Sequence, residues 1–183
     1  MGLKALEDFN FYSAVSDEIL KKYQDLIPAE LTEVWKEYGF GSFYNGYLKT
    51  INPDEYMDIF NDSCFAGSDS IPIFTTGFGD IIAWQINRYV LLIEYRKNDA
   101  TTLSAGFKFF FDDLTIEGSP LIKKLDKGLY DKALSVHGSL EYDECFGFFP
   151  LLVLGGGEKA INLKKVKIIP HIDLITQSAG RIE

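Results

Sequence analysis

The sequence has few of the residues on which disulfides, zinc sites and most nucleophilic catalysis depend. Among its 183 residues are two cysteines and two histidines. Cys64 and Cys145 lie far apart in the chain and form no CxxC pair, and no ligand spacing indicates a metal site. We therefore expect a protein that folds in a reducing compartment without a disulfide, a metal or any other cofactor.

Basic residues are also scarce. Eighteen lysines and arginines stand against 27 aspartates and glutamates, which gives a formal net charge of −9. Nucleic acids and anionic membranes bind basic surfaces, so neither is expected as a partner, whereas a basic protein is compatible with this charge. The longest apolar run, in FGFFPLLVLGGG, is too short to span a bilayer, and the N-terminus lacks a signal-peptide pattern. We expect a cytoplasmic protein.

Apolar residues, by contrast, are plentiful. They make up 46% of the chain, and aromatic residues alone make up 15%. A chain of this length and composition can bury a core large enough to fold without covalent cross-links. No linker, internal repeat or shift of composition marks a boundary, so we expect a single compact unit over residues 1–183.

Helix starts in the N-terminal third are marked by capping residues. Ser16 can cap a first helix, and Pro28 can open a second that ends at Gly39. Asn52, followed by a proline, can cap a short third helix that ends near Asn61. Apolar residues recur at helical spacing in the first two: Ile19, Leu20, Tyr23, Leu26 and Ile27, then Leu31, Val34, Trp35 and Tyr38.

Further helices are expected in the C-terminal half. The stretch GFKFFFDDL fits a helix or a strand, and we favour a helix that covers the sheet. Residues 129–138 fit a helix whose inward side includes His137, and Pro170 is expected to open a last helix. Between these two helices, CFGFFPLLVLGGG is expected to be a buried segment that ends in a glycine turn.

Period-two alternation from residue 71 to residue 95 predicts an antiparallel sheet with one buried side. A two-residue turn at Asn87-Arg88 would place one set of apolar residues on that side: Ile82, Trp84, Ile86, Tyr89, Leu91, Ile93 and Tyr95. Glu94 and Arg96 would then lie on the solvated face. With the helices, these strands predict an α+β fold whose helices pack mainly on one face of the sheet.

The glycine-rich stretch TTGFGD could bind a phosphate or join two strands. A dinucleotide site needs a third glycine and a following helix, whereas Gly77 and Gly79 precede an apolar strand. We therefore predict a short turn in which Thr76 faces Asp80, with Asp80 at the rim of the sheet. Residues 155–157 are also glycines, but they lack the Gly-Lys-Ser/Thr of a P-loop and are expected to form a turn.

An acidic cluster in EYDEC combines three carboxylates. Paired carboxylates can perform acid–base chemistry or bind Ca²⁺, but the alternating acids and internal glycine of a calcium loop are missing. A short acidic loop is the simpler interpretation, and a patch that docks on a basic partner is the functional alternative. Two tyrosines around an Asn-Gly turn form a second candidate recognition loop. We predict partner contacts at Glu141, Asp143, Glu144, Asp80, Tyr44 and Tyr47.

A cysteine–histidine enzyme is the catalytic alternative. Cys145 could act with His137 or with His171, yet neither histidine has an obvious serine or cysteine nucleophile partner in the sequence. His171 is expected in the first turn of the last helix, where the helix dipole disfavours a charged imidazole. We predict no catalytic residue.

Several stretches resemble a known family. Residues 27–48, IPAELTEVWKEYGFGSFYNGYL, are similar to the start of the GAD-like domain, and NPDEY and IPIFTTGFGD continue the likeness. The C-terminal stretch from LEYDECFGFFPLLVLGGG onward resembles the C-terminal segment of the Tdi-type immunity proteins of type VI secretion. The two segments, about 1–106 and 107–183, occur in tandem in that family, and the wider resemblance is to the SUKH superfamily of α+β proteins.

The resemblance implies a function by binding. It implies an immunity protein that neutralises a toxin delivered between competing bacteria, with a nuclease as the expected toxin class. It supplies no catalytic residue, and no residue is carried over as a toxin contact. An acidic chain also suits electrostatic attraction to a basic nuclease. The alternative is an intracellular ligand-binding or regulatory scaffold module without a toxin partner.

Overall fold

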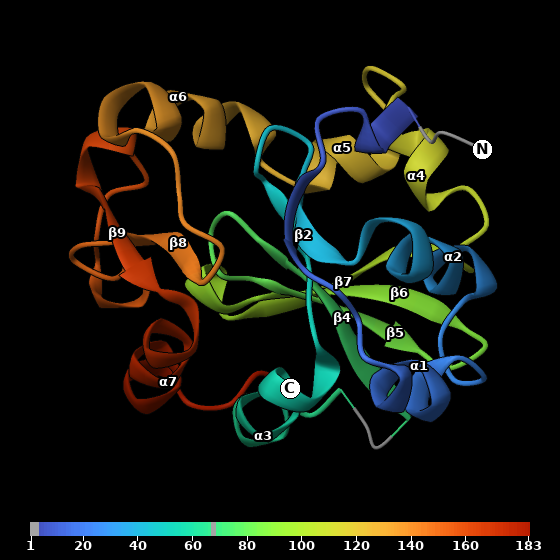
Figure 1. Cartoon of the computed structure of the whole chain (residues 1–183). Coiled ribbons are helices and arrows are strands. Elements are labelled where there is room, and N and C mark those ends of the chain that lie inside the picture. The colour runs from blue at the N-terminus through green and yellow to red at the C-terminus, as the bar shows by residue number, and fades with distance from the viewer. Residues whose placement is uncertain (1–3, 67–68) are drawn as a thin grey trace.

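The computed structural model describes residues 4–66 and 69–183, and its centre is a seven-stranded antiparallel sheet. The strands follow one another across the sheet in chain order, so β1 and β7 are its two edges (Figure 1). The strands are β1 (Asn10–Ser13), β2 (Phe40–Phe43), β3 (Leu48–Thr50), β4 (Ser70–Thr76), β5 (Ile81–Gln85), β6 (Tyr89–Glu94) and β7 (Asp99–Ala105).

Helices fill the connections and the C-terminal half. They are α1 (Asp17–Tyr23), α2 (Ala29–Tyr38), α3 (Pro53–Ser63), α4 (Phe110–Asp113), α5 (Pro120–Lys124), α6 (Lys127–His137) and α7 (Ile168–Ala179). A separate ribbon of β8 (Glu144–Phe148) and β9 (Leu163–Lys167) lies between α6 and α7 (Figure 1). No helix in the described part of the chain is long and apolar enough to cross a membrane.

The predicted caps start their helices as expected. The Ser16 hydroxyl accepts from the Ile19 amide at 3.3 Å, and the Asn52 side chain accepts from the Asp54 amide at 3.1 Å. Each cap satisfies an amide that has no partner within its helix. The GFKFFFDDL stretch is confirmed as helical around α4, while α7 begins at Ile168, two residues before the expected start.

Helices cover both faces of the sheet (Figure 1). On one face, a large core joins α1, α2 and α4–α6 to strand residues such as Phe74 and Ile82. On the other face, a smaller core joins α3 and α7 to Ile81 and Ile93. The α+β class is confirmed and most helices share one face, but the prediction of a solvated second face is wrong, because α3 and α7 bury it.

The register of the β5–β6 hairpin also differs from the prediction. Three residues, 86–88, connect the strands, and Asn87 takes a left-handed conformation with φ of 58°. The extra residue pairs Ile82 with Leu92 and Trp84 with Val90. A shift of one residue moves every side chain to the opposite face. Most side chains of both sets are still buried, because the sheet is covered on both faces, but Tyr89 at the start of β6 is 41% exposed.

Candidate functional site

The acidic loop, residues 141–144, is a tight turn that leads into β8. The Glu144 amide donates to the Glu141 carbonyl across the turn at 3.1 Å. The ammonium of Lys49 in β3 donates to the carbonyl oxygen of Glu141, at 3.0 Å, and to the carbonyl oxygen of Glu144. Lys49 is 1% exposed, and burial lowers its pKa to about 8, so most of it is protonated at neutral pH. A lysine of the sheet thus fixes the backbone of the loop.

The three carboxylates of this loop differ in their surroundings. The Asp143 side chain is 61% exposed and lies 2.7 Å from the ammonium of Lys167. The Glu144 side chain is 21% exposed and turns back to accept from the Glu141 amide at 3.0 Å. Glu141 is exposed and forms no ion pair with another described residue. The structure therefore presents Glu141 and Asp143 to solvent and uses Glu144 partly to close the turn.

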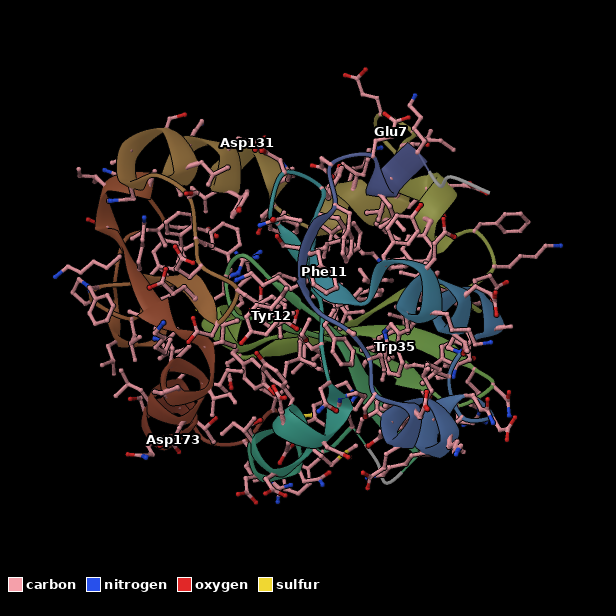
Figure 2. The ribbon with its side chains drawn as sticks, in the orientation of Figure 1. Glu7, Phe11, Tyr12, Trp35, Asp131 and Asp173 are labelled. Atoms are coloured by element: carbon pink, nitrogen blue, oxygen red, sulfur yellow. The ribbon has the colours of Figure 1, made fainter. Side chains whose placement is uncertain are left out.

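Tyrosines connect the acidic loop to the edge of the sheet. The Tyr142 hydroxyl donates to the Thr50 carbonyl at 2.6 Å, which anchors the loop beside β3. Its ring stacks on Tyr12 of β1, with centroids 3.9 Å apart and planes 11° apart. Tyr12 is still 60% exposed. In Figure 2, Tyr12 lies on the side of the N-terminal strand that faces the C-terminal segment.

A shallow hollow of about 270 Å³ lies beside this tyrosine pair. Tyr12, Tyr142 and Asp143 line it together with Glu55 from the first turn of α3. We define the acidic aromatic surface as these four residues and Glu141. Exposed aromatic rings with carboxylates around them suit protein recognition, because the rings offer contact area at little entropic cost and the charges select the partner.

Helix α3 extends the negative charge. Its sequence, PDEYMDIFNDS, contains four acids and no basic residue. All four are exposed: Asp54, Glu55, Asp58 and Asp62. Asp54 is paired with Lys22 of α1, at 2.5 Å between Nζ and Oδ1. The remaining acids carry a field that favours a positively charged partner near the acidic aromatic surface.

Asp80 has a different environment from the one predicted. It is 1% exposed, and its carboxylate accepts from Arg96 Nε at 2.9 Å. The same guanidinium reaches Glu94 at 3.2 Å and Asp126 at 2.8 Å, and it lies over the Phe78 ring. Burial raises the pKa of Asp80 to about 6, and Arg96 opposes that shift. We call these four charged residues, Asp80, Glu94, Arg96 and Asp126, the buried arginine cluster.

The cluster corrects two predictions. Asp80 cannot touch a partner at the surface, because its side chain is enclosed. Glu94 and Arg96 were expected on a solvated face but are 6% and 4% exposed.

Thr76 and Asp80 face each other across the glycine turn, as predicted, and two hydrogen bonds join them. The Asp80 amide donates to the Thr76 hydroxyl at 3.2 Å, and the Thr76 amide donates to the Asp80 carbonyl at 2.9 Å. The threonine hydroxyl, rather than the Asp80 carboxylate, ties down this turn.

The two candidate tyrosines of the β2–β3 turn also have different positions. Tyr47 is fully buried and its hydroxyl donates to the Leu125 carbonyl, so the prediction of a partner contact there is wrong. Tyr44 is half-buried and lines a hollow of about 460 Å³ with Asp8 and Lys127. The Asp8 carboxylate accepts from the Tyr44 amide at 2.9 Å, which holds the turn in its left-handed conformation.

Cys145 has the environment of a core residue. It is 0% exposed, and burial raises the pKa of its thiol to about 12, so the nucleophilic thiolate is disfavoured. In the described part of the chain, no hydrogen bond joins it to either histidine. His137 instead lies 2.8 Å from the Ala160 carbonyl, and burial lowers the pKa of His171 to about 4. Within residues 4–66 and 69–183, no group of acids, cysteines or histidines is arranged to hold a metal ion.

Three residues of the acidic aromatic surface were missed by the sequence prediction: Tyr12, Glu55 and Tyr142. Tyr142 stands between the predicted acids, and an aromatic ring inside an acidic loop is a recognisable sign of a contact surface. Tyr12 and Glu55 are far from that loop in sequence, and only the pairing of β1 with β2 and the position of α3 bring them there.

In comparisons with known proteins, two family models match consecutive segments of this chain. The model of the GAD-like domain matches residues 2–95, and the model of the C-terminal part of the type VI secretion immunity protein Tdi1 matches residues 104–178. No curated protein matches. Both segments contribute to the acidic aromatic surface, since Tyr12 and Glu55 lie in the first and the acidic loop lies in the second.

A solved structure shares the fold. The crystal structure of Atu4351 from Agrobacterium tumefaciens superposes with a TM-score of 0.77 at 17% sequence identity, covering 96% of this chain and 88% of that one. At this identity the likeness concerns the fold alone.

Proposed function

This chain belongs to the GAD-like domain family, and on that premise we propose that it is an immunity protein that binds and neutralises a toxin of type VI secretion. The match of residues 104–178 to the Tdi1 C-terminal model supports the immunity role. The acidic aromatic surface supports a basic toxin domain, such as a nuclease, as the partner. Binding rather than chemistry is the mode of action that we propose.

The observation that carries this proposal is the composite surface itself. Tyr12 and Glu55 from the GAD-like segment meet Tyr142 and Asp143 from the immunity segment in one hollow. The large core also contains residues of both segments, including Phe74 and Phe111 with rings 6.3 Å apart. We propose that the two segments act as one unit, because separating them would dismantle both the core and the surface.

Co-expression tests the proposal. The toxin domain encoded beside this gene is induced in a susceptible host, with and without this protein. We expect growth only when the protein is present. The double variant Glu141→Lys with Asp143→Lys is expected to protect less well. Glu30→Lys with Glu33→Lys changes the charge equally on α2 and is expected to protect fully. Equal rates of cell death with and without the protein would refute the immunity role.

A ligand-binding module is the second candidate function. The hollow beside Tyr44 favours it, because that hollow is the larger one and combines an aromatic ring with Lys127 and Asp131. Tyr44→Ala distinguishes the two candidates. It should leave protection unchanged if the acidic aromatic surface is the contact, and it should abolish binding of a small ligand found by thermal-shift screening if the hollow is a ligand site.

A further inference from the structure

The edge strand β1 is open to another strand. It is the first strand of the sheet, and three of its four residues are exposed. Apart from its pairing with β2, its backbone makes no hydrogen bond to another described segment. Unpaired amide and carbonyl groups along such an edge can pair with an extended segment of a second protein.

The opposite edge, β7, is protected in ways that β1 is not. The ammonium of Lys124 donates to the Thr102 carbonyl and covers part of the β7 backbone. The exposed positions of β7 are small or polar. In β1, by contrast, Phe11 is 62% exposed and Tyr12 is 60% exposed. Proteins usually place charges on free edges to prevent pairing with other chains. Two exposed aromatic residues on β1 therefore indicate an edge that contacts another protein.

Two hollows flank this edge, one on each face of the sheet. Phe11 lines one of about 350 Å³ together with Trp35 and Tyr38 of α2. Tyr12 lines the other, of about 270 Å³, together with the acids of the acidic aromatic surface. Figure 2 shows Phe11 and Tyr12 following one another along the strand at the front, with Trp35 beside it. Successive side chains of an added strand would point alternately toward these two hollows.

The two hollows differ in chemistry. Around Phe11 the lining is largely apolar, and its two charges, Lys36 and Glu37, are of opposite sign. Around Tyr12 the lining contains two acids and Lys167, which is already paired with Asp143. An apolar side chain suits the first hollow and a basic side chain suits the second.

We propose that β1 binds a short extended segment of a partner protein in which apolar and basic side chains alternate. The segment adds to the sheet as an eighth strand, with its basic side chains toward Glu55 and Asp143. A bulge at Tyr12 interrupts the β1 ladder, so the paired stretch is about as short as β1 itself. This inference deepens the proposed function and rests on it, since the segment would belong to the toxin, but the strand pairing can be tested without the toxin.

A pair of synthetic peptides provides the probe. Acetyl-Lys-Val-Lys-Val-Lys-Val-amide and the matching glutamate–valine peptide share strand propensity and differ in charge. Each is titrated into the full-length ¹⁵N-labelled protein, and amide shifts are followed by NMR. We expect saturable shifts centred on residues 10–13 and on the acidic loop, with binding of the lysine peptide at least about tenfold tighter.

Two matched variants separate strand pairing from general attraction to an acidic protein. Tyr12→Lys and Phe109→Lys make the same charge change at aromatic residues that are each 60% exposed. Tyr12→Lys should weaken lysine-peptide binding by about tenfold or more, and Phe109→Lys should leave it unchanged. The inference would be overturned by amide shifts that spread over the acidic surface but leave β1 unaffected, or by an equal loss of peptide affinity in both variants. Shifts that follow protein concentration alone would indicate self-association and would also overturn it.

The toxin assay keeps the two proposals apart. If the protein protects cells but Tyr12→Lys protects as well as Phe109→Lys, the immunity role stands and the strand inference fails. If no toxin is neutralised while the lysine peptide pairs with β1, the edge is a binding site and the immunity role fails.

Discussion

Carboxylates occupy two contrasting places in this protein. In the buried arginine cluster, Asp80 is 1% exposed and is held by Arg96. In the acidic loop, the Asp143 side chain is 61% exposed and meets only the flexible ammonium of Lys167. The first set connects the sheet to the start of α6 through Asp126, and the second set leaves its charge available to a partner. Burial, rather than residue type, separates the acids that hold the fold together from those that are exposed to solvent.

The largest effect is expected from breaking the buried arginine cluster. Arg96→Met leaves the enclosed Asp80 without its cation and leaves Glu94 with Lys97 alone, which should lower the free energy of unfolding by about 3–5 kcal/mol. Urea unfolding followed by circular dichroism measures it. Lys36→Met, which removes an exposed ion pair on α2, should cost less than about 0.5 kcal/mol. Similar losses in the two variants would show that burial does not separate the two kinds of charge.

A pH titration extends the comparison from buried acids to a buried base. His171 is 4% exposed, and burial lowers its pKa from 6.5 to about 4. Between these values the unfolded chain takes up a proton that the folded chain excludes. Stability should therefore fall by about 2–3 kcal/mol from this residue as pH drops from 7 to 4. Urea unfolding at each pH measures the slope, and His171→Leu should flatten it; an unchanged slope in that variant would contradict the assignment.

Lys49 supports the acidic loop from within the sheet. Lys49→Met leaves the carbonyls of Glu141 and Glu144 without their buried donor, which should cost about 1–2 kcal/mol. Amide hydrogen exchange should quicken in residues 141–146 and stay unchanged in β5 and β6. A uniform change across the sheet would mean that Lys49 supports the fold as a whole instead of this loop.

The smallest effect on stability is expected at the exposed acids. Glu141→Lys combined with Asp143→Lys should change the free energy of unfolding by less than about 0.5 kcal/mol, because both side chains are largely solvated. Thermal and urea unfolding provide the measurement. A loss comparable with that of Arg96→Met would place these acids among the residues that hold the fold.

Local features of the structure were predictable from the sequence. Ser16 and Asn52 cap the helices they were expected to cap, because a cap depends on residues within one turn. The glycine turn before β5 and the aromatic helix α4 follow from equally short stretches. The acidic loop was also recognised as a loop, since EYDEC combines acids and an aromatic residue without a helical or strand pattern.

Features that depend on distant partners were not predictable. Arg96 and Glu94 look like a solvated strand end until Asp126, some thirty residues later, is placed against them by α6. The β5–β6 register changed because Asn87 accepts a left-handed conformation in a three-residue connection. Tyr12 belongs to the candidate surface only because β1 forms the sheet edge beside Tyr142. For Arg96, Glu94 and Tyr12 a long-range contact that the local pattern does not show decides their surroundings, whereas for the hairpin one extra residue in the connection decides which side chains share a face.

The most direct test of the central claim is the association rate with the purified toxin domain encoded beside this gene, measured by stopped flow over a range of NaCl concentrations. We predict that salt slows association of the wild-type protein steeply, and that Glu141→Lys with Asp143→Lys associates about tenfold more slowly at low salt with a weaker salt dependence. Glu30→Lys with Glu33→Lys should match the wild type. Identical rates and salt dependence in both double variants would contradict the claim that the acidic aromatic surface recognises a basic toxin.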